Sequence, residues 1–139
     1  MEPKVNLWIE IDGQVILSRW RVELLTAIAE TGSISSAADR MGVPYRRAWQ
    51  KIHEMEERLG ASLLETQTGG SGGGGAHLTQ TAQDYIIRFQ QFSEGIDLYV
   101  QRHFQEAFLG TVKEQSLAHC LARNHPEQRP ELVEGPVEG

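Results

Sequence analysis

The sequence has little cysteine, no long hydrophobic run and fewer basic than acidic residues, and each shortage excludes a class of protein. Its single cysteine, Cys120, excludes an internal disulfide framework and a multi-cysteine zinc site. No apolar run approaches the about 20 residues that a membrane-spanning helix needs. The N-terminus lacks the basic region and small-residue cleavage site of a signal peptide. We therefore expect a cytoplasmic protein that makes no membrane contact.

Positive charge is also scarce. The 139 residues include 13 Lys and Arg against 19 Asp and Glu, which gives a formal net charge of −6. This balance argues against a nucleic-acid binder, because phosphate contacts depend on Lys and Arg. Net charge is only an average, however, so the position of the charges decides the question. With 40% hydrophobic and 23% charged residues, the chain has the composition of one soluble globular domain.

The N-terminal part predicts a β hairpin followed by a helix. Two apolar-rich runs, 5–11 and 14–18, flank an Asp-Gly pair, which is a strong short-range hairpin signal. From Arg21 the apolar spacing becomes helical, and Gly32 stands where a helix C-cap is expected.

Two further helices are predicted beyond this point. Ser33 or Ser35 can cap a short helix that Gly42 ends. Pro44, placed in the first turn, opens a third helix over about 45–59.

The remaining pattern is a two-strand ribbon and a long helix. Short strands are expected at Leu63-Leu64 and at Leu78, on either side of the glycine-rich run 69–75, and a helix over about 81–109. The order predicts a mainly α fold with small β elements, a winged helix-turn-helix with an N-terminal β hairpin and a long C-terminal dimerisation helix. We expect the domain to span 1–110 and to be followed by a flexible acidic tail over 111–139.

The third helix divides into two faces when rotated by about 100° per residue. The face expected in the core comprises Ala48, Ile52, Met55 and Leu59, flanked by Tyr45 and Trp49. The opposite face carries Arg46, Arg47 and Gln50, and then Glu54, Glu57 and Arg58. In a helix-turn-helix the second helix of the pair enters the DNA major groove by its N-terminal residues. A basic beginning and a mainly acidic end fit such end-on docking.

Arginine and glutamine have suitable chemistry for base edges, since Arg can bond guanine and Gln can bond adenine. The alternative is an ordinary solvated face, and Tyr45 can either reach a phosphate or pack beneath the turn. The predicted DNA-binding residues lie on the two helices and on the ribbon: Ser33, Ser35, Tyr45, Arg46, Arg47, Gln50, Lys51, Gly70, Ser71, Gly72 and Gly73.

The glycine-rich run itself has three interpretations. A nucleotide-binding loop is disfavoured because no Gly-Lys-Ser/Thr follows and no helix begins there. A flexible linker is the default for such a composition. Its position between two short strands of one domain favours a wing tip, whose glycine N–H groups can approach the sugar-phosphate backbone closely.

The sequence contains no recognisable catalytic or metal-binding motif, so we expect neither an enzyme nor a metal site. The five histidines are scattered, without the spacing of a ligand set. They are His53, His77, His103, His119 and His125.

An aromatic stripe on the long helix predicts a dimer. Its members step by 4, 3, 4 and 3 residues, which is the spacing of a heptad seam. They are Tyr85, Phe89, Phe92, Ile96 and Tyr99. The stripe can instead be core that faces the winged domain. Together with a neighbouring apolar stripe it is broader than a small domain covers, which favours a homodimer through this helix.

The run LLTAIAETGSISSAADRMGVPYRRAWQKIHEMEERLG and the later TGGSGGGGAHLT resemble the N-terminal DNA-binding domain of the molybdate-responsive ModE-type repressors, and more distantly the LysR-type helix-turn-helix. The resemblance covers about residues 5 to 110. It implies a cytoplasmic homodimer that binds a palindromic operator in double-stranded DNA, commonly to repress molybdate-uptake genes. It also assigns Tyr45, Arg46, Arg47 and Gln50 to the recognition helix and 69–79 to the wing.

The sequence departs from this family at several positions. Pro44 replaces a usual serine, Ser71 a usual Lys or Arg, and Thr66 lies where an arginine is frequent, so we expect weak nonspecific affinity for DNA. In full-length relatives molybdate-binding domains follow the long helix. The about thirty residues that follow it here are too few for such a domain, so we expect no cofactor in this chain. The rival function is a protein-interaction module on the same scaffold.

Overall fold

The computed structural model describes residues 1–67, 75–111 and 117–123. Its first elements are the strands β1 (Trp8–Ile11) and β2 (Gln14–Ser18), which pair antiparallel with Ile11 opposite Gln14. Asp12 and Gly13 form the two-residue turn with φ of 51° and 73°. Two successive positive φ angles match the right-handed twist of a hairpin, which explains the Asp-Gly pair. The hairpin is confirmed, but its first strand begins at Trp8 and not at residue 5.

Three helices follow the hairpin. They are α1 (Arg19–Thr31), α2 (Ile34–Met41) and α3 (Tyr45–Leu59). The Ser18 hydroxyl caps α1 by accepting the Arg21 N–H at 3.1 Å, so this helix begins two residues earlier than predicted. The third helix has the predicted bounds.

The turn between α2 and α3 contains Gly42, with φ +68°, which ends α2 in the left-handed region. Pro44 then occupies the N-cap position of α3 and not its first turn. Its ring supplies no capping hydroxyl, so α3 begins without a side-chain cap.

The wing strands β3 (Leu64–Gln67) and β4 (Gly75–Leu78) pair antiparallel, with Leu64 opposite Leu78. Leu63, expected in the strand, precedes it and is fully buried. The predicted wing-tip residues Gly70, Ser71, Gly72 and Gly73 lie outside the described residues.

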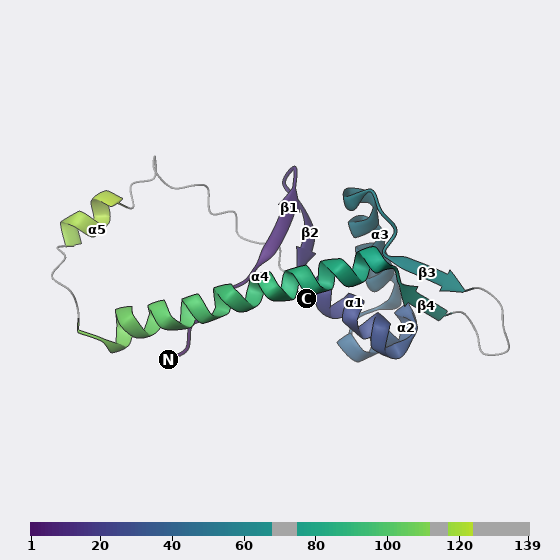
Figure 1. Ribbon diagram of the computed structural model, residues 1–139, viewed down its shortest axis with the longest axis horizontal. Helices are drawn as coiled ribbons and strands as arrows, with labels where there is room; N and C mark the ends of the chain where they lie inside the picture. Colours follow the sequence, from purple (N-terminus) through teal and green to yellow (C-terminus); the bar gives the residue numbers. More distant parts are fainter. Residues whose placement is uncertain (68–74, 112–116, 124–139) are drawn as a thin grey trace.

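The long helix α4 (Gln80–Phe104) crosses the domain and extends well beyond it (Figure 1). It continues as a π-helical turn, η1 (Gln105–Leu109), so the predicted helix over 81–109 is α-helical only to Phe104. A short helix that the pattern did not predict, α5 (Leu117–Arg123), lies within the region expected to be a flexible tail. No helix of the described residues is long and apolar enough to cross a membrane.

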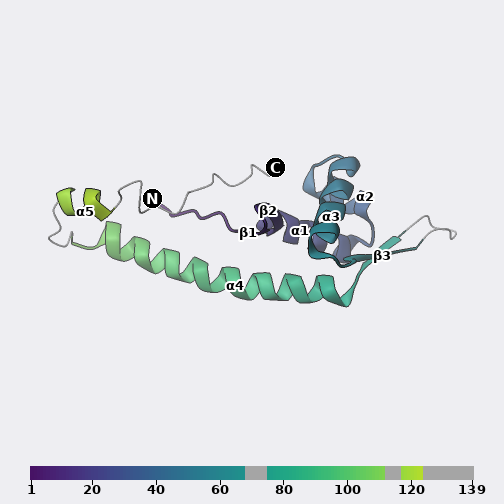
Figure 2. The same ribbon diagram turned by 90° about the horizontal axis from the view of Figure 1, so that it is seen from above.

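The core lies among α1, α2, α3 and the first half of α4. Its fully buried aliphatic side chains include Leu24, Leu25, Ile28, Ile52 and Met55. Figure 2 shows α4 along one side of the domain, while α3 packs against α2, β2 and α1. The two helices whose functions were predicted therefore face different surroundings.

Candidate nucleic-acid interface

The helix α3 presents three sides to different environments. Ala48, Ile52 and Met55 are fully buried, as predicted. Tyr45 and Trp49, expected to flank the core, are 53% and 44% exposed. The fully exposed or largely exposed side chains of α3 form one continuous surface, which we call the outer face: Tyr45, Arg46, Trp49, Gln50, His53 and Glu57.

The third side of α3 is an ion-pair network around a buried cation. Arg21 in α1 is only 1% exposed, and its guanidinium donates to the Lys51 carbonyl at 3.2 Å and to Glu54 at 3.0 Å. Lys51 and Arg58 approach the same Glu54 carboxylate at 3.6 and 3.7 Å. Glu54 is thus partly buried, with 22% of its side chain exposed, and it lies at the edge of the outer face, where its Oε1 accepts a hydrogen bond from Gln50 Nε2 at 3.2 Å. Its assignment to the solvent face beside Glu57 is corrected to this partly buried position.

Electrostatics keep Glu54 ionised in this network. Burial alone would raise the pKa of the Glu54 carboxyl, but the hydrogen bond from Arg21 and the charges of Lys51, Arg21 and Arg58 outweigh it. The pKa of Glu54 is therefore held below its usual value. A paired Glu54 places little uncompensated negative charge near the outer face.

Two residues that were predicted to contact DNA, Arg47 and Lys51, are partly buried in this arrangement. Arg47 is half-buried, and its guanidinium carbon lies 6.0 Å from the centre of the Trp20 ring in α1. Lys51 is partly buried beside Glu54. Three of the predicted recognition-helix residues lie on the outer face, namely Tyr45, Arg46 and Gln50. The other two, Arg47 and Lys51, lie on the side of α3 that faces α1. The sequence analysis did not predict that Trp49 and His53 would be exposed on the outer face, because helical periodicity gave no signal that places them there.

The two serines at the start of α2 also differ in environment. The Ser33 hydroxyl caps the helix by accepting the Ser36 N–H at 3.0 Å, whereas Ser35 is exposed. The structure therefore gives Ser33 a local role, and leaves Ser35 on the surface.

Hydrogen bonds join the wing to α3 and to the C-terminal end of α1. The Glu56 carboxylate of α3 accepts the N–H groups of Leu63 and Leu64 at 2.9 and 3.3 Å. On the other strand, Ala76 donates its N–H to the carbonyl of Gly32, the C-cap of α1, at 2.8 Å. The base of the wing is thereby held in a fixed position relative to α3.

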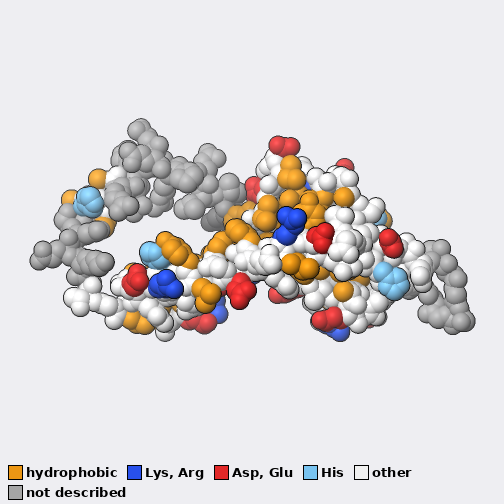
Figure 3. Space-filling model, in the orientation of Figure 1, with side chains coloured by type: hydrophobic (Ala, Val, Ile, Leu, Met, Phe, Trp, Pro, Cys, Tyr) orange, Lys and Arg blue, Asp and Glu red, His pale blue; other side chains and the backbone are white. Residues whose placement is uncertain are grey.

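The predicted aromatic stripe of α4 is divided between the core and the surface. Phe89 is 3% exposed and packs into the core of the single chain, while Tyr85 is partly buried against it. Phe92 and Tyr99 are 46% and 62% exposed. Ile96 is partly buried. The side chains available to a partner are thus fewer than the sequence suggested, but Figure 3 shows hydrophobic side chains at intervals along the whole of α4.

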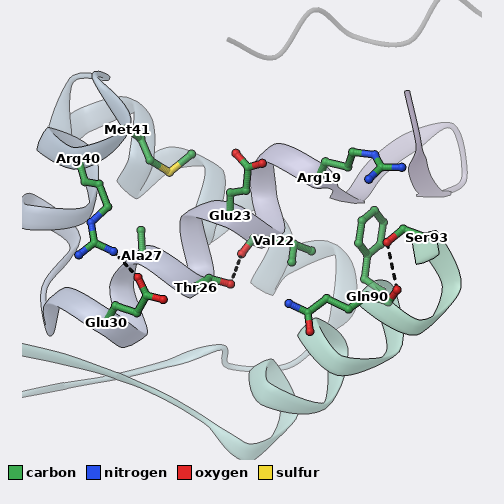
Figure 4. A pocket seen from close by; sticks show the side chains of 11 residues that line it. Arg19, Val22, Glu23, Thr26, Ala27, Glu30, Arg40, Met41, Gln90 and Ser93 are labelled. Carbon is green, nitrogen blue, oxygen red and sulfur yellow. Dashed lines mark hydrogen bonds and ion pairs between the residues drawn. The ribbon is translucent and has the colours of Figure 1, made fainter. Parts of the chain in front are cut away.

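A groove runs between α1, α2 and the middle of α4, with a volume of about 420 Å³ (Figure 4). Arg40 pairs with Glu30 in its wall, and Arg19 donates to Asp97 of α4 at 2.5 Å. Arg19, Glu30 and Arg40 line the groove together with apolar side chains that include Met41 and Phe89. Within the described part of the chain, no group of three or more His, Cys, Asp or Glu residues is placed to hold a metal ion.

Comparisons with known proteins agree with this geometry. Residues 20–83 match the model of the bacterial regulatory helix-turn-helix protein, lysR family. The chain is 37% identical over 117 residues to the transcriptional regulator ModE of Yersinia pestis, which covers 84% of this chain and 41% of that protein. It is 44% identical over 100 residues to the molybdenum transport protein ModE of Herbaspirillum seropedicae, covering 72% and 36%. The chain thus spans about two fifths of the length of these relatives.

Among solved structures, the CbnR DNA-binding domain in complex with DNA matches with a TM-score of 0.51 and 24% identity. The match covers 63% of this chain and 95% of that one. This likeness confirms the winged helix-turn-helix fold.

Proposed function

We propose that this chain, whose residues 20–83 form a LysR-type helix-turn-helix domain, is a sequence-specific DNA-binding transcriptional regulator that acts as a homodimer. The observation that carries the proposal is the outer face of α3. It exposes Tyr45, Arg46 and Gln50 at the N-terminal end of the helix, while the charge of the partly buried Glu54 is balanced by nearby basic side chains of α1 and α3. A helix with this distribution of charge enters the major groove by its N-terminus.

The exposed residues have distinct tasks in this docking. Arg46 can donate two hydrogen bonds to a guanine edge, and Gln50 can pair with adenine, each with about 1–3 kcal/mol of discrimination. The hydroxyl of Tyr45 reaches the phosphate backbone. Glu57 lies about three turns from the N-terminus, so it stays outside a groove that α3 enters end-on.

The wing supplies the second contact. Glu56 and Gly32 fix the base of the wing beside α3 and α1. The predicted tip over 69–75, which lies outside the described residues except for Gly75, is proposed from its glycine-rich sequence to contact the sugar-phosphate backbone. The described wing strands contain Glu65 but no Lys or Arg. Nonspecific affinity is therefore weak, and specificity depends on α3.

Dimerisation uses the part of α4 that the domain leaves uncovered. Phe92, Leu98 and Tyr99 are 46%, 65% and 62% exposed. Phe92 adjoins the buried Ser93, whereas Leu98 and Tyr99 follow Asp97, which pairs with Arg19 of α1. The groove of Figure 4 adjoins this part of α4. A second copy covers these side chains and brings two α3 helices into successive major grooves, about 34–36 Å apart.

The names of the relatives extend the proposal to the target genes. ModE of Yersinia pestis is a transcriptional regulator, and its counterpart in Herbaspirillum seropedicae is named a molybdenum transport protein. We assign this chain to the same class of target, as a cytoplasmic repressor of molybdenum-related genes.

The test is selection from a library of randomised DNA duplexes with the full chain. An enriched inverted repeat, with half-sites separated by about one helical turn, is the expected result. Arg46→Ala should weaken the enrichment and relax the selected base at one position of each half-site, whereas Lys4→Ala, which removes the same charge from the exposed segment before β1, should not. A library that remains random through all rounds contradicts the proposal and favours the protein-interaction module.

A further inference from the structure

Two aromatic rings on the outer face of α3 have no role in the core or in the contacts described above. Trp49 is 44% exposed, and the His53 ring stacks on it with centroids 3.7 Å apart and planes at 24°. The buried side of the same helix is already filled by Ala48, Ile52 and Met55. An exposed tryptophan with a fixed neighbour indicates a contact surface, because Trp is enriched where proteins bind partners.

The histidine holds the indole in one orientation. Its Nδ1 lies 2.9 Å from the carbonyl oxygen of Trp49. A carbonyl only accepts, so Nδ1 carries the hydrogen and donates. This bond fixes the imidazole, and the fixed imidazole covers part of the indole. The part of the indole that remains exposed is thus presented rigidly to a partner.

The position of the pair determines what it meets in the proposed complex. Tyr45, Trp49 and His53 are spaced by four residues, so they form one apolar ridge along the outer face. Arg46 and Gln50 lie beside this ridge and make the polar contacts to base edges. The remaining feature of the major groove is apolar, namely the 5-methyl group of thymine.

We propose that the Trp49–His53 stack is a specificity determinant that recognises a pyrimidine 5-methyl group, that of thymine, in the major groove. The inference rests on the proposed function. It extends that function by naming thymine as the base that the ridge of Tyr45, Trp49 and His53 contacts. The dimer interface proposed for α4 does not include this stack, because α3 packs against α2, β2 and α1 and the stack lies on its exposed outer face.

The experiment replaces single thymines of the selected duplex with deoxyuridine, which removes only the methyl group. For the wild-type chain, at least one position in each half-site should weaken binding about fourfold, the effect of burying one methyl group. Trp49→Ala should bind thymine and uracil duplexes equally at that position, while still preferring the selected duplex through Arg46 and Gln50. Trp49→Phe should keep part of the discrimination.

A second pair of duplexes tests whether the methyl group itself is recognised, separately from the other groups of thymine. Cytosine and 5-methylcytosine are compared at the same position, and a methyl effect that appears there and depends on Trp49 supports methyl recognition independently of the thymine edge. His53→Ala releases the indole and should reduce the thymine preference without abolishing it. Thermal unfolding of each variant confirms that it is folded before binding is measured.

The inference is overturned if the thymine-to-uracil effect is the same in wild type and Trp49→Ala, or if no thymine responds to loss of its methyl group. These results leave the proposed function intact, because the selected duplex is still bound. Failure to select any duplex overturns the proposed function instead, and this inference with it.

Discussion

Arg21 and Glu54 show how single residues orient the recognition helix. The Arg21 guanidinium is buried beneath α3, and its bond to Glu54 draws one side of α3 toward α1. Arg47 and Lys51, which share that side, are drawn inward with it. A charge pair between residues 33 positions apart in the sequence thus acts together with the buried apolar side of α3 in setting which side of the helix is exposed.

Breaking this pair should destabilise the fold strongly. Glu54→Gln leaves the Arg21 guanidinium in the interior without its carboxylate, and loss of one partner of a buried pair costs about 3 kcal/mol. The free energy of unfolding, measured by urea denaturation, should fall by about this amount. Glu57→Gln changes the same charge at an exposed position of the same helix, and its effect should stay within about 0.5 kcal/mol. Equal effects of the two variants would refute the structural role of the pair.

The pair also predicts a dependence of stability on pH. The pKa of Glu54 is lower in the folded chain than its usual value. Its ionised form therefore contributes stability that is fully present above about pH 4.3, the ordinary glutamate value, and is lost as the pH falls through the folded pKa. The stability difference between wild type and Glu54→Gln should shrink below about pH 4.3. A difference that stays constant down to pH 3 would contradict the charge network.

At the scale of single elements, the start of α2 offers a matched pair of serines. Ser33 caps the helix through its hydroxyl, whereas Ser35 is exposed in the first turn. Ser33→Ala should therefore lower the free energy of unfolding by about 1 kcal/mol, and Ser35→Ala by less than about 0.5 kcal/mol. Thermal denaturation of the two variants measures the difference, and the reverse order would show that the cap is misassigned.

The wing should loosen when its connection to α3 is removed. Glu56→Ala deprives the Leu63 and Leu64 N–H groups of their acceptor, and the lost bonds cost about 1–3 kcal/mol. Amide hydrogen exchange should accelerate at these two residues, while Leu24 and Leu25 in α1 keep their protection. Uniform acceleration across the domain would mean that Glu56 stabilises the whole fold and not the wing.

Sequence patterns predicted the bounds of the helices and strands better than the tertiary contacts of individual side chains. The bounds of α3 follow from Pro44 and Gly60, which are local signals, and the burial of Ala48, Ile52 and Met55 follows from helical rotation. The inward turn of Arg47 depends on Trp20 and Arg21 in another helix, which no local pattern contains. Phe89 shows the same limit, since an aromatic stripe with heptad spacing fits both a core and a dimer seam.

At the scale of the whole molecule, α4 packs on the domain with its first half and carries exposed apolar side chains that a second copy is proposed to cover. Phe92→Asp with Tyr99→Asp places charge on two exposed rings and should convert the dimer to a monomer with little loss of domain stability. Sedimentation equilibrium measures the change in mass. Phe89→Asp is the contrasting variant, because Phe89 is 3% exposed and its replacement should unfold the domain. A wild-type chain that sediments as a monomer at every concentration would contradict the dimer.

The central claim is that the outer face of α3 binds DNA sequence-specifically, and its most direct test is fluorescence anisotropy. The full chain is titrated into the selected duplex and into a duplex of the same composition in shuffled order, each at two salt concentrations. The account predicts at least about thousandfold tighter binding to the selected duplex. It also predicts a fall in affinity with rising salt and a preference that Arg46→Ala reduces at least about fivefold, the loss of about 1 kcal/mol or more of discrimination. Equal affinity for both duplexes, or a preference that Arg46→Ala leaves unchanged, would contradict it.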